Sequence, residues 1–314
     1  MPKLSFQYVR LEAAETLLAF LTRRFRYHTP QEWEGLVEQG FLLVDGRTVS
    51  PRHVLQTREK IVYERPPFQE PEVDPSFSIV FEDDHLLAVN KSGNIPTSPS
   101  GKYWDNCLVH VLKKELGLRA LHAVHRLDRE TSGLNLFAKT REAAARLGRE
   151  FQQGRVAKRY SSILKGHLTA REIFLSAPLL GQRGGEVRIK QAVHPQGKAC
   201  KTRFRLRAIL PGASLVSVRP LTGRTHQIRA HAAFLGHPVW GDKLYGASEA
   251  EFLRWVARQD GKFGTRQLLH ATELELIHPL TGKLITLRSP DNVLLELFWA
   301  EGPPGVRTTG VERR

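Results

Sequence analysis

A proline-rich, acidic stretch near residue 70 divides the chain into two parts that are expected to fold separately. Residues 66–75 read PPFQEPEVDP, and prolines at this spacing favour extended backbone over helix. We therefore expect a small N-terminal unit over residues 1–66, a linker over 67–76 and a larger unit over 77–300. Residues 301–314, which include two adjacent prolines, glycines and charges, are expected to form a flexible tail.

The N-terminal unit shows signals in the order helix, helix, short strands. Apolar residues at helical spacing predict a helix over 11–25. Thr29, Pro30 and Glu32 together form the signature of a capped helix start, and Gly40 is expected to end that second helix. Short strands joined by tight turns are expected over 41–44, 47–49 and 60–63.

Residues 34–47 of this unit read EGLVEQGFLLVDGR. The stretch resembles the small S-four-type RNA-binding module, which is named for a ribosomal protein and is found fused to RNA-modifying enzymes. The resemblance implies that the unit binds RNA. Without the resemblance, its arginines are better explained as a solvated face, and they are Arg23, Arg24, Arg26, Arg47, Arg52 and Arg58.

The larger unit combines helices and strands without regular alternation. Strand signals recur after residue 77, and the stretch up to residue 218 is expected to be mostly strand after the second of its helices. This pattern predicts an α+β fold, with a mixed, mostly antiparallel sheet and flanking helices. The helices are expected over residues 106–116, 140–152 and 226–235, and the last strands over 273–277 and 284–287.

Residues 121–134 of the larger unit place one carboxylate between two arginines. They read LHAVHRLDRETSGL, with Asp128 between Arg126 and Arg129, and with Gly133 permitting a sharp bend or a close backbone approach. One interpretation is a structural ion pair, which the spacing alone favours. The other is a catalytic carboxylate that adjacent positive charge keeps ionised. Taken by itself, the stretch leaves both interpretations open.

The charge of the chain indicates a polyanionic partner. Its 314 residues include 47 lysines and arginines against 32 acidic residues, a formal net charge of +15. Nucleic acid is the first candidate and an anionic membrane surface the second. No apolar run is long enough to span a membrane, and no signal-peptide pattern is present, so we expect no membrane partner. Cys107 and Cys200 form no disulfide framework, which fits a reducing compartment and predicts a cytoplasmic protein.

The motif HRLDRETSG over residues 125–133 resembles the central motif of the RluA-type family of RNA pseudouridine synthases. It is long and chemically mixed, so its specificity is high. Further similar segments follow in order, and the resemblance covers residues 77–298. These segments are VAKRY at 156–160, GKACKT at 197–202, LTGRTHQIRAH at 221–231, HPVWGDKLYG at 237–246 and LHA at 269–271.

The resemblance implies an enzyme that isomerises uridine to pseudouridine within an RNA chain. By residue-for-residue correspondence, Asp128 matches the essential aspartate of the family. Tyr160 matches the tyrosine that stacks on the target base, and it is also a candidate for helping to remove the proton from carbon 5 of uracil. Arg224 matches the basic residue that pairs with the aspartate. Arg126 matches the arginine that helps to displace the target nucleotide from its stack.

We expect the basic side chains around this site to hold the RNA backbone without reading its sequence. The candidates for RNA contact, besides Arg126, are Arg129, Lys158 and Arg229. Members of the family act on ribosomal and on transfer RNA, and the N-terminal module favours ribosomal RNA as the substrate, with transfer RNA as the alternative. We expect the protein to be a monomer.

A single carboxylate fits this reaction. Cleavage of a glycosidic bond builds positive charge on the sugar, which a nearby carboxylate stabilises. Ordinary glycoside hydrolysis needs a second acid, whereas departing uracil delocalises its own negative charge. Three roles for Asp128 stay open, namely attack on the ribose, attack on the base, and removal of a ribose proton.

No metal ion and no cofactor are expected. His226 and His231 are five residues apart, which is not the i, i+4 spacing of a helical zinc pair, and no third ligand is evident. No phosphate-binding glycine loop of a nucleotide cofactor is present. Two other functions are alternatives to the synthase. The joint presence of Asp128, Tyr160 and Arg224 argues against a non-catalytic RNA-binding protein, and the lack of a second carboxylate argues against a hydrolase.

Overall fold

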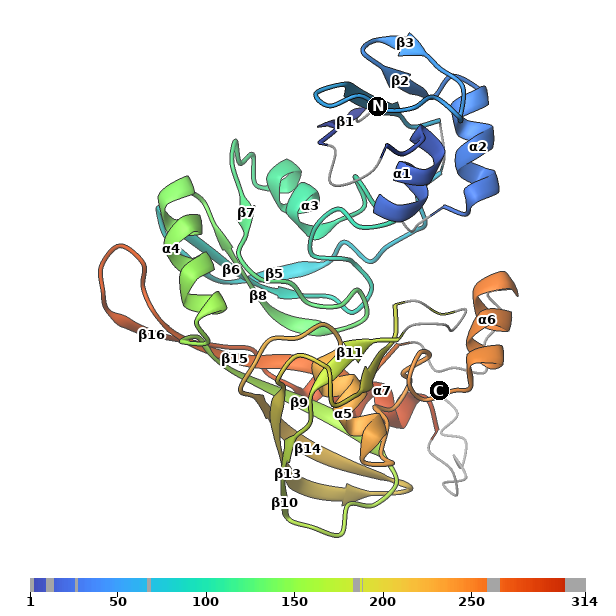
Figure 1. The fold of residues 1–314 in the computed structure, drawn as a ribbon. Helices are drawn as coiled ribbons and strands as arrows, with labels where there is room; N and C mark the ends of the chain where they lie inside the picture. Colours follow the sequence, from blue (N-terminus) through green and yellow to red (C-terminus); the bar gives the residue numbers. More distant parts are fainter. Residues whose placement is uncertain are drawn as a thin grey trace, which may run out of the picture. The chain divides into compact units, whose positions relative to one another are not determined.

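The computed structural model divides the chain into two compact units, Met1–Glu70 and Pro71–Arg314 (Figure 1). The division falls within the stretch for which a linker is expected. The described part of the chain leaves out residues 1–2, 10–13, 26–27, 67–68, 183–186, 188, 259–265 and 303–314. From residue 303 onward, the expected tail therefore lies outside the described residues. No helix of the described part is both long and apolar enough to cross a membrane.

The first unit is a four-stranded antiparallel sheet with two helices (Figure 1). The strands lie in the order β1-β4-β2-β3. The N-terminal strand β1 was not predicted from the sequence. The elements are β1 (Lys3–Gln7), α1 (Leu17–Arg24), α2 (Pro30–Glu38), β2 (Leu42–Val44), β3 (Arg47–Thr48) and β4 (Lys60–Glu64).

Helix α2 begins with the predicted capping box. The Thr29 side chain accepts a hydrogen bond from the Glu32 backbone at 3.2 Å, and the Glu32 carboxylate accepts one from the Thr29 backbone at 2.7 Å. Both bonds satisfy backbone N–H groups that a helix start would otherwise leave without partners. Trp33 of this helix is fully buried in the unit's core, so the capped end also fixes the core.

The second unit is built on one ten-stranded sheet. Its strands lie in the order β10-β13-β14-β9-β15-β8-β6-β5, with β16 beside β15 and β7 beside β8, and a separate pair joins β11 and β12. The strands are β5 (Phe77–Glu82), β6 (Leu86–Lys91), β7 (His122–Ala123), β8 (Ser132–Ala138), β9 (Ala157–Lys165), β10 (Glu172–Ser176), β11 (Leu179–Gly181), β12 (Gln191–Val193), β13 (Lys201–Leu210), β14 (Ala213–Pro220), β15 (Leu269–Ile277) and β16 (Leu284–Arg288).

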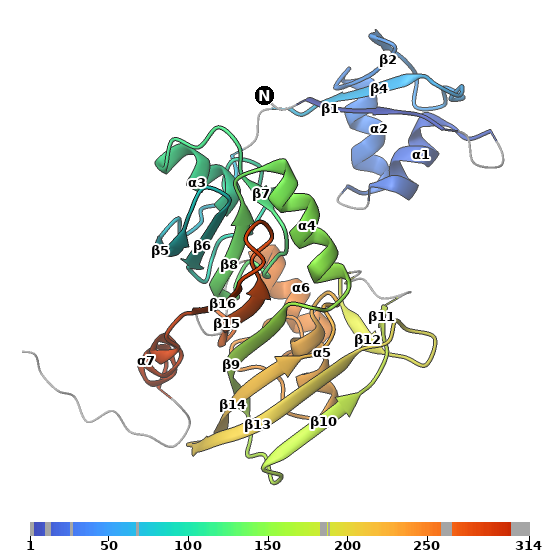
Figure 2. The same cartoon turned by 90° about the vertical axis from the view of Figure 1, so that its left-hand side faces the viewer.

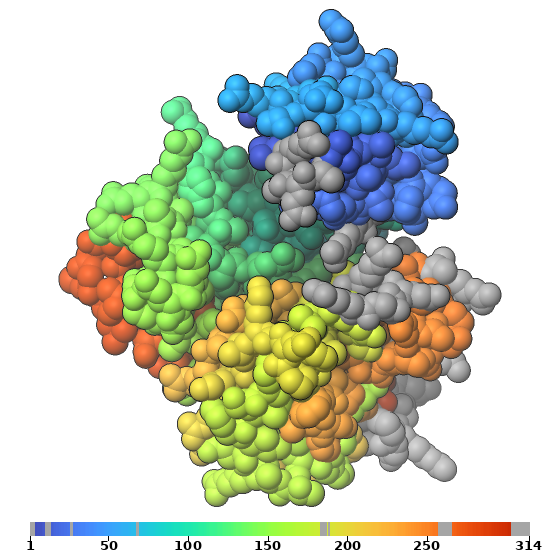
Figure 3. All heavy atoms as spheres, viewed as in Figure 1, coloured from blue at the N-terminus to red at the C-terminus, as the bar shows by residue number. Residues whose placement is uncertain are grey.

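Neighbouring strands of this sheet are antiparallel except for β8 and β15, which run parallel. Helices flank the sheet, and the predicted α+β class is confirmed. In the space-filling view, yellow-green and orange segments share one surface, so distant parts of the chain build it together (Figure 3). The helices are α3 (Leu108–Glu115), α4 (Arg141–Gln152), α5 (Gln227–Phe234), α6 (Glu249–Arg258) and α7 (Asn292–Ala300).

Helices cover the two faces of the sheet unequally. Around β6 and β8 both faces are buried, because alternate side chains of β6 join a core with α4 on one face and a core with α3 on the other. At the other end of the sheet, α5 packs on one face of β9, β13 and β14. Among the described helices, α7 packs on the opposite face there and covers part of it. Figure 2 shows the broad layer of β9, β14, β13 and β10 side by side.

Gly133 allows β8 and β15 to approach each other closely. It pairs with Ala271, its φ is +102°, and a Cβ built on it would lie 2.2 Å from the Ala271 carbonyl oxygen. Both the backbone angle and this distance exclude a side chain. The close backbone approach expected at this glycine is present, and it places the end of the preceding loop at the junction of the two strands.

Candidate active site

Asp128 lies in the loop that connects β7 to β8. The preceding residue, Leu127, is buried in the core beneath α4, and its backbone N–H donates to the Thr97 hydroxyl at 3.1 Å. A turn follows, in which the Thr131 N–H donates to the Asp128 carbonyl at 3.1 Å. The carboxylate is therefore presented by a loop that is anchored on both sides.

A buried lysine holds the same loop from below. Lys91, at the end of β6, is 1% exposed, and its ammonium group donates to three backbone carbonyls. The acceptors are Ser92 and Ile95, each at 2.8 Å, and Arg129 at 3.0 Å. A buried charge is tolerable only when it is fully hydrogen-bonded, so this lysine ties the residue after Asp128 to β6.

His125 supports the loop as a neutral ring. Its Nε2 accepts a hydrogen bond from the Leu136 backbone at 2.9 Å, and its ring stacks on Phe151 with centroids 4.7 Å apart. Burial, and then the charge of Lys158, lower the pKa of His125 to about 3. A ring that is neutral at physiological pH, with Nε2 already occupied, positions the loop and is not a proton carrier.

The second long motif supplies the partner of Asp128. Arg229 lies in the first turn of α5, and its Nη1 donates to Asp128 Oδ2 at 2.8 Å. Its Nε and Nη2 donate to the two carboxylate oxygens of Asp242, at 2.7 and 2.8 Å. One guanidinium thus spans two carboxylates, which its fork of donors permits.

Asp242 fixes the orientation of that guanidinium. Its side chain is fully buried, and its Oδ1 also accepts hydrogen bonds from the backbones of Leu244 at 2.9 Å and Tyr245 at 3.0 Å. The Tyr245 ring lies against the guanidinium of Arg229, 5.1 Å from its centroid. Residues 237–246 were recognised as a motif from the sequence, but the part played by Asp242 was missed.

His226 stands at the start of α5 in a left-handed conformation, with φ of +54°. Its Nδ1 lies 3.1 Å from the Tyr245 hydroxyl, and its Nε2 lies 3.9 Å from Asp128 Oδ1. A non-glycine residue with positive φ is uncommon, and such strain concentrates at functional sites. This turn directs the histidine toward Asp128 while α5 continues to Arg229.

The electrostatic balance keeps Asp128 ionised. Its side chain is 25% exposed. Burial alone would raise the pKa of Asp128, but the charges of Arg229, His226 and Arg126 and the hydrogen bond from Arg229 lower it below 3.8. Burial disfavours the charged form of His226 as well and therefore lowers its pKa, whereas the negative charge of Asp128 acts in the opposite direction. The site at neutral pH therefore holds an aspartate anion beside a guanidinium.

Tyr160 lies in the middle of β9, between Val218 of β14 and Ala271 of β15. Its ring packs against the cores on both sides of this position. Burial, and then the negative charge of Asp128, raise the pKa of Tyr160 above its ordinary value. The phenol therefore keeps its proton at neutral pH, and its ring lies within the electrostatic reach of the aspartate.

Comparison with known proteins identifies this arrangement. The family model described as RNA pseudouridylate synthase matches residues 85–234. The chain is 38% identical to ribosomal large subunit pseudouridine synthase C of Vibrio cholerae, over 69% of the chain and 67% of that protein. It is 36% identical to ribosomal large subunit pseudouridine synthase D of Zymomonas mobilis, over 70% of the chain and 71% of that protein.

A relative from Synechocystis, described as an uncharacterized RNA pseudouridine synthase, is 32% identical over 87% of the chain and 93% of that protein. Among solved structures, the human RNA pseudouridylate synthase domain containing protein 1 is similar, with a TM-score of 0.58 and 30% identity over 73% of this chain and 89% of that chain. The chain belongs to the RluA-type family of RNA pseudouridine synthases. It is an isomerase that acts on RNA and converts uridine to pseudouridine.

Within this synthase, the structure corrects the predicted partner of the aspartate. Arg224 was expected to pair with Asp128, yet Asp128 is bonded to Arg229. Arg224 is exposed, and its Nε donates to the Ala199 carbonyl at 3.2 Å. Across the described residues, no ion pair joins it to Asp128. The physical reason is the turn at His226, which separates the loop of Arg224 from the helix that carries Arg229.

The predicted RNA-contact residues of the synthase differ in their surroundings. Lys158 is partly buried and donates to the Thr222 carbonyl at 3.4 Å, so it supports the loop of the second motif. Arg129 donates to the Tyr103 hydroxyl and, at 3.1 Å, to the Glu130 carboxylate. Arg126 is exposed, and among the described residues no carboxylate lies within ion-pair distance of its guanidinium.

The histidines considered as metal ligands have other partners. His231 is fully buried, with Nδ1 2.8 Å from the Thr202 hydroxyl and Nε2 2.9 Å from the Ala177 carbonyl. A carbonyl can only accept, so Nε2 carries the proton and Nδ1 accepts from the hydroxyl. In the part of the chain that the structure describes, no group of three or more potential ligands is arranged to hold a metal ion.

Proposed function

We propose that this synthase modifies specific uridines of structured ribosomal RNA through Asp128. The names of the relatives from Vibrio cholerae and Zymomonas mobilis support a ribosomal substrate. Transfer RNA is the alternative substrate. The net charge of +15 supports a polyanion of either kind.

One observation carries the assignment of Asp128 as the essential carboxylate. It is an ionised, partly exposed carboxylate with one oxygen bound to a buried arginine and the other open. The bonded Oδ2 fixes the group in place. Oδ1 faces His226 at 3.9 Å, which is longer than a hydrogen bond, and is the atom that meets the nucleotide.

The reaction breaks the bond between ribose carbon 1 and uracil nitrogen 1 and forms a bond between the same ribose carbon and uracil carbon 5. Positive charge develops on the ribose as the first bond breaks, and the Asp128 anion stabilises it. The uracil leaves with the bonding electron pair, turns, and reattaches through carbon 5. Carbon 5 then loses its proton, and nitrogen 1 takes up a proton. No atom is gained or lost, so water must be excluded while the base is free.

Tyr160 and Arg126 act on the base before the chemistry. The enzyme cannot reach a base that is paired and stacked, so the nucleotide must first leave its stack, which costs about a few kcal/mol of free energy. Stacking on the Tyr160 ring returns about 1–3 kcal/mol of this. The raised pKa of Tyr160 favours a stacking role over proton removal, because a protonated phenol is a poor base. Arg126, being exposed, occupies the space that the displaced nucleotide leaves.

The N-terminal unit adds RNA affinity as an S-four-type module. The resemblance of residues 34–47 and the basic residues of that unit support this assignment. We also propose that the protein acts as a monomer in the cytoplasm. In support, one chain supplies the whole cluster of Asp128, Arg229 and Asp242, and both cysteines are free and buried.

Tritium release from RNA labelled at uracil carbon 5 tests the proposal, because only the transfer to carbon 5 frees that hydrogen. We expect Asp128→Asn to abolish release while RNA affinity stays within about threefold, since the substitution removes a charge but little volume. Full release by this variant would refute the role of Asp128. Mapping pseudouridines in ribosomal and transfer RNA from a strain that lacks the gene would identify the substrate.

A further inference from the structure

One face of the catalytic sheet carries a group of arginines that the active site does not use. On β13 and β14, Phe204 and Val218 point toward α5, as Tyr160 does on β9. Side chains of a strand alternate between its two faces. Their neighbours Arg203 and Arg219 therefore project from the opposite face, away from α5 and its catalytic arginine.

Helix α7 covers only part of this opposite face. Ile163 and Leu215 belong to it, and they are buried against Leu294 and Phe298 of the helix. Farther along the same strands, α7 no longer covers this face, and the side chains on it are polar and not apolar. The uncovered part is hereafter the arginine face, defined as the residues that line two adjoining hollows: Arg159, Ser161, Glu172, Arg203, Arg205, Arg207, Ser217, Arg219, Thr272, Glu273, Arg288, Ser289 and Asp291.

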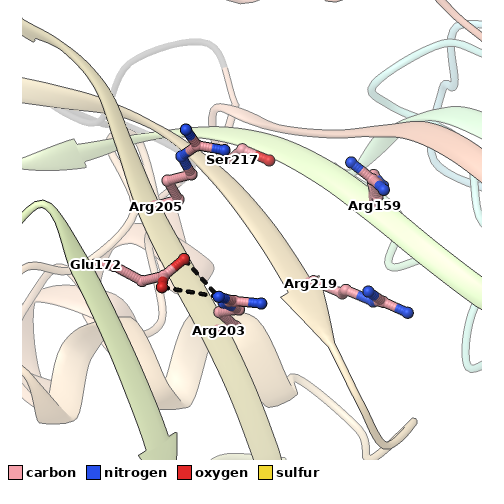
Figure 4. Close-up of a pocket in the computed structure, with 6 residues that line it drawn as sticks. All are labelled: Arg159, Glu172, Arg203, Arg205, Ser217 and Arg219. Atoms are coloured by element: carbon pink, nitrogen blue, oxygen red, sulfur yellow. Dashed lines mark hydrogen bonds and ion pairs between the residues drawn. The ribbon is translucent and has the colours of Figure 1, made fainter.

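The two hollows are open and polar. Their volumes are about 260 and 250 Å³, and they share Arg159 and Ser217, so they adjoin each other. Figure 4 shows the side chains of the first hollow standing on strands that lie next to one another. A shallow hollow lined by guanidinium and hydroxyl groups suits an anionic, solvated ligand and does not suit an apolar one.

The arginine face has an excess of positive charge. It contains six arginines and three carboxylates, which leaves three positive charges over. Glu172 is held by Arg203 through two bonds of 2.8 Å, as Figure 4 shows. The other two carboxylates are also engaged, since Glu273 lies between Arg159 and Arg288, each at 3.0 Å, and Asp291 pairs with Arg207.

Two arginines remain without such a partner. In the described residues, no carboxylate lies within ion-pair distance of Arg205 or Arg219, and both are exposed. Arg219 is directly opposite Arg203 in the ladder of β13 and β14. Like charges at such positions destabilise a sheet, and a bound anion would remove that repulsion. Beside them, Phe174 pairs with Arg203 and is 58% exposed, which offers a ring for stacking.

We propose that the arginine face binds the phosphate backbone of the substrate RNA, at a segment away from the target nucleotide. The inference rests on the proposed function and extends it, because Asp128 and Arg229 lie on the α5 side of the sheet. Guanidinium groups bind phosphate oxygens in a bidentate manner, and such contacts position an RNA without reading its sequence. The enzyme then needs a substrate long enough to reach both faces.

The test compares the double variant Arg205→Gln, Arg219→Gln with a control, Lys114→Gln, Arg119→Gln. Both remove two positive charges from exposed positions, and the control pair lies at and just after α3. Affinity for a long RNA duplex of arbitrary sequence is measured between about 50 and 200 mM salt. Each lost phosphate contact lowers the salt slope by about 0.9, so we expect the slope to fall by about 2 and affinity to weaken on the order of tenfold in the first variant.

We expect the control variant to keep the wild-type slope and melting temperature. The Arg205 and Arg219 variant should melt no lower than the wild type, since it removes no partner of a buried pair and relieves the repulsion between Arg203 and Arg219. A wild-type slope in the Arg205 and Arg219 variant would overturn the inference, whatever the enzyme's activity. Unchanged RNA binding together with lost binding of poly-glutamate would assign the face to an acidic protein segment and would also overturn it. Absence of tritium release by the wild type, with the slope change present, would refute the proposed function and leave the inference standing.

Discussion

Replacing Arg229 by lysine keeps the positive charge of the site but removes the guanidinium that binds Asp128 and Asp242 at the same time. The guanidinium makes three charge-assisted bonds of 2.7–2.8 Å, two to Asp242 and one to Asp128. A lysine ammonium carries the same charge, but it is a point donor and does not span both carboxylates. It is expected to stay with Asp242, because that carboxylate is fully buried whereas Asp128 is 25% exposed and can be solvated.

The expected magnitudes follow from the bonds that are lost. A hydrogen bond to a charged group contributes about 1.5–3 kcal/mol, so the loss of one or two bonds should destabilise the fold by about 2–5 kcal/mol. An opposite charge close to an acid lowers its pKa by about 1–3 units. Moving that charge away from Asp128 while its burial persists should raise the pKa of Asp128, because the largest charge that opposes the effect of burial is weakened.

The direction of the pH effect follows from the same balance. In the wild type the pKa of Asp128 lies below 3.8, so activity should be lost only as pH falls through that lower value. In Arg229→Lys the loss should begin at a higher pH, and the rate of tritium release is measured between about pH 4 and 8 to find it. Arg224→Lys is the matched control, because Arg224 contacts a backbone carbonyl and not Asp128. The reasoning would be refuted if the rate of Arg229→Lys fell at the same acidic pH as that of the wild type. It would also be refuted if the rate of Arg224→Lys began to fall at a higher pH than that of the wild type.

Two further substitutions test how the catalytic loop is supported. Gly133→Ala should destabilise the fold by several kcal/mol, because its Cβ would lie 2.2 Å from the Ala271 oxygen at a φ of +102°. Thermal unfolding measures this, and Gly148→Ala in α4, where a Cβ meets no atom within 4 Å, should instead stabilise by about 0.5–1 kcal/mol. Lys91→Met should lower the maximal rate at least about tenfold with a smaller effect on RNA affinity, because the carbonyls of Ser92, Ile95 and Arg129 lose the ammonium group that joins them and the loop shifts. A wild-type rate in Lys91→Met would show that the loop keeps its place without the lysine.

The features that the sequence predicts best are those whose residues lie next to one another along the chain. Asp128 was singled out from the stretch 121–134, because an acid between two arginines and a nearby glycine lie within one segment, although that stretch alone left the role of Asp128 open. The capping box at Thr29 is local in the same sense, and its prediction is confirmed. For both, the determining contacts lie within a few residues along the chain.

The partner of the aspartate could not be predicted in this way. Arg224 and Arg229 are both basic and belong to one motif, and they differ only in which side of the turn at His226 they occupy. That turn has a positive φ at a residue other than glycine, for which sequence has no reliable signal. Asp242 was missed because its role depends on a contact across thirteen residues, between a loop and the first turn of α5.

For the arginine face as well, the sequence predicts the local strand but not the contacts between distant parts of the chain. The alternation KTRFRLR over residues 201–207 indicates a strand with one charged and one apolar side. It does not show that the charged side of β14 and β9 joins that of β13, because this depends on strand order. Nor does it show that α7, more than eighty residues later in the chain, covers part of the face and leaves the rest exposed.

The two carboxylates that share Arg229 have different parts in the charge balance. Asp242 is fully buried and takes two of the three guanidinium bonds, so together they form a pair without net charge. Asp128 is then the surplus anion, and only the remaining bond and more distant charges hold it ionised. This charge balance explains how a partly buried acid stays unprotonated. Asp242, which is itself held by two backbone N–H groups, fixes the direction of the guanidinium and therefore the position from which Arg229 binds Asp128.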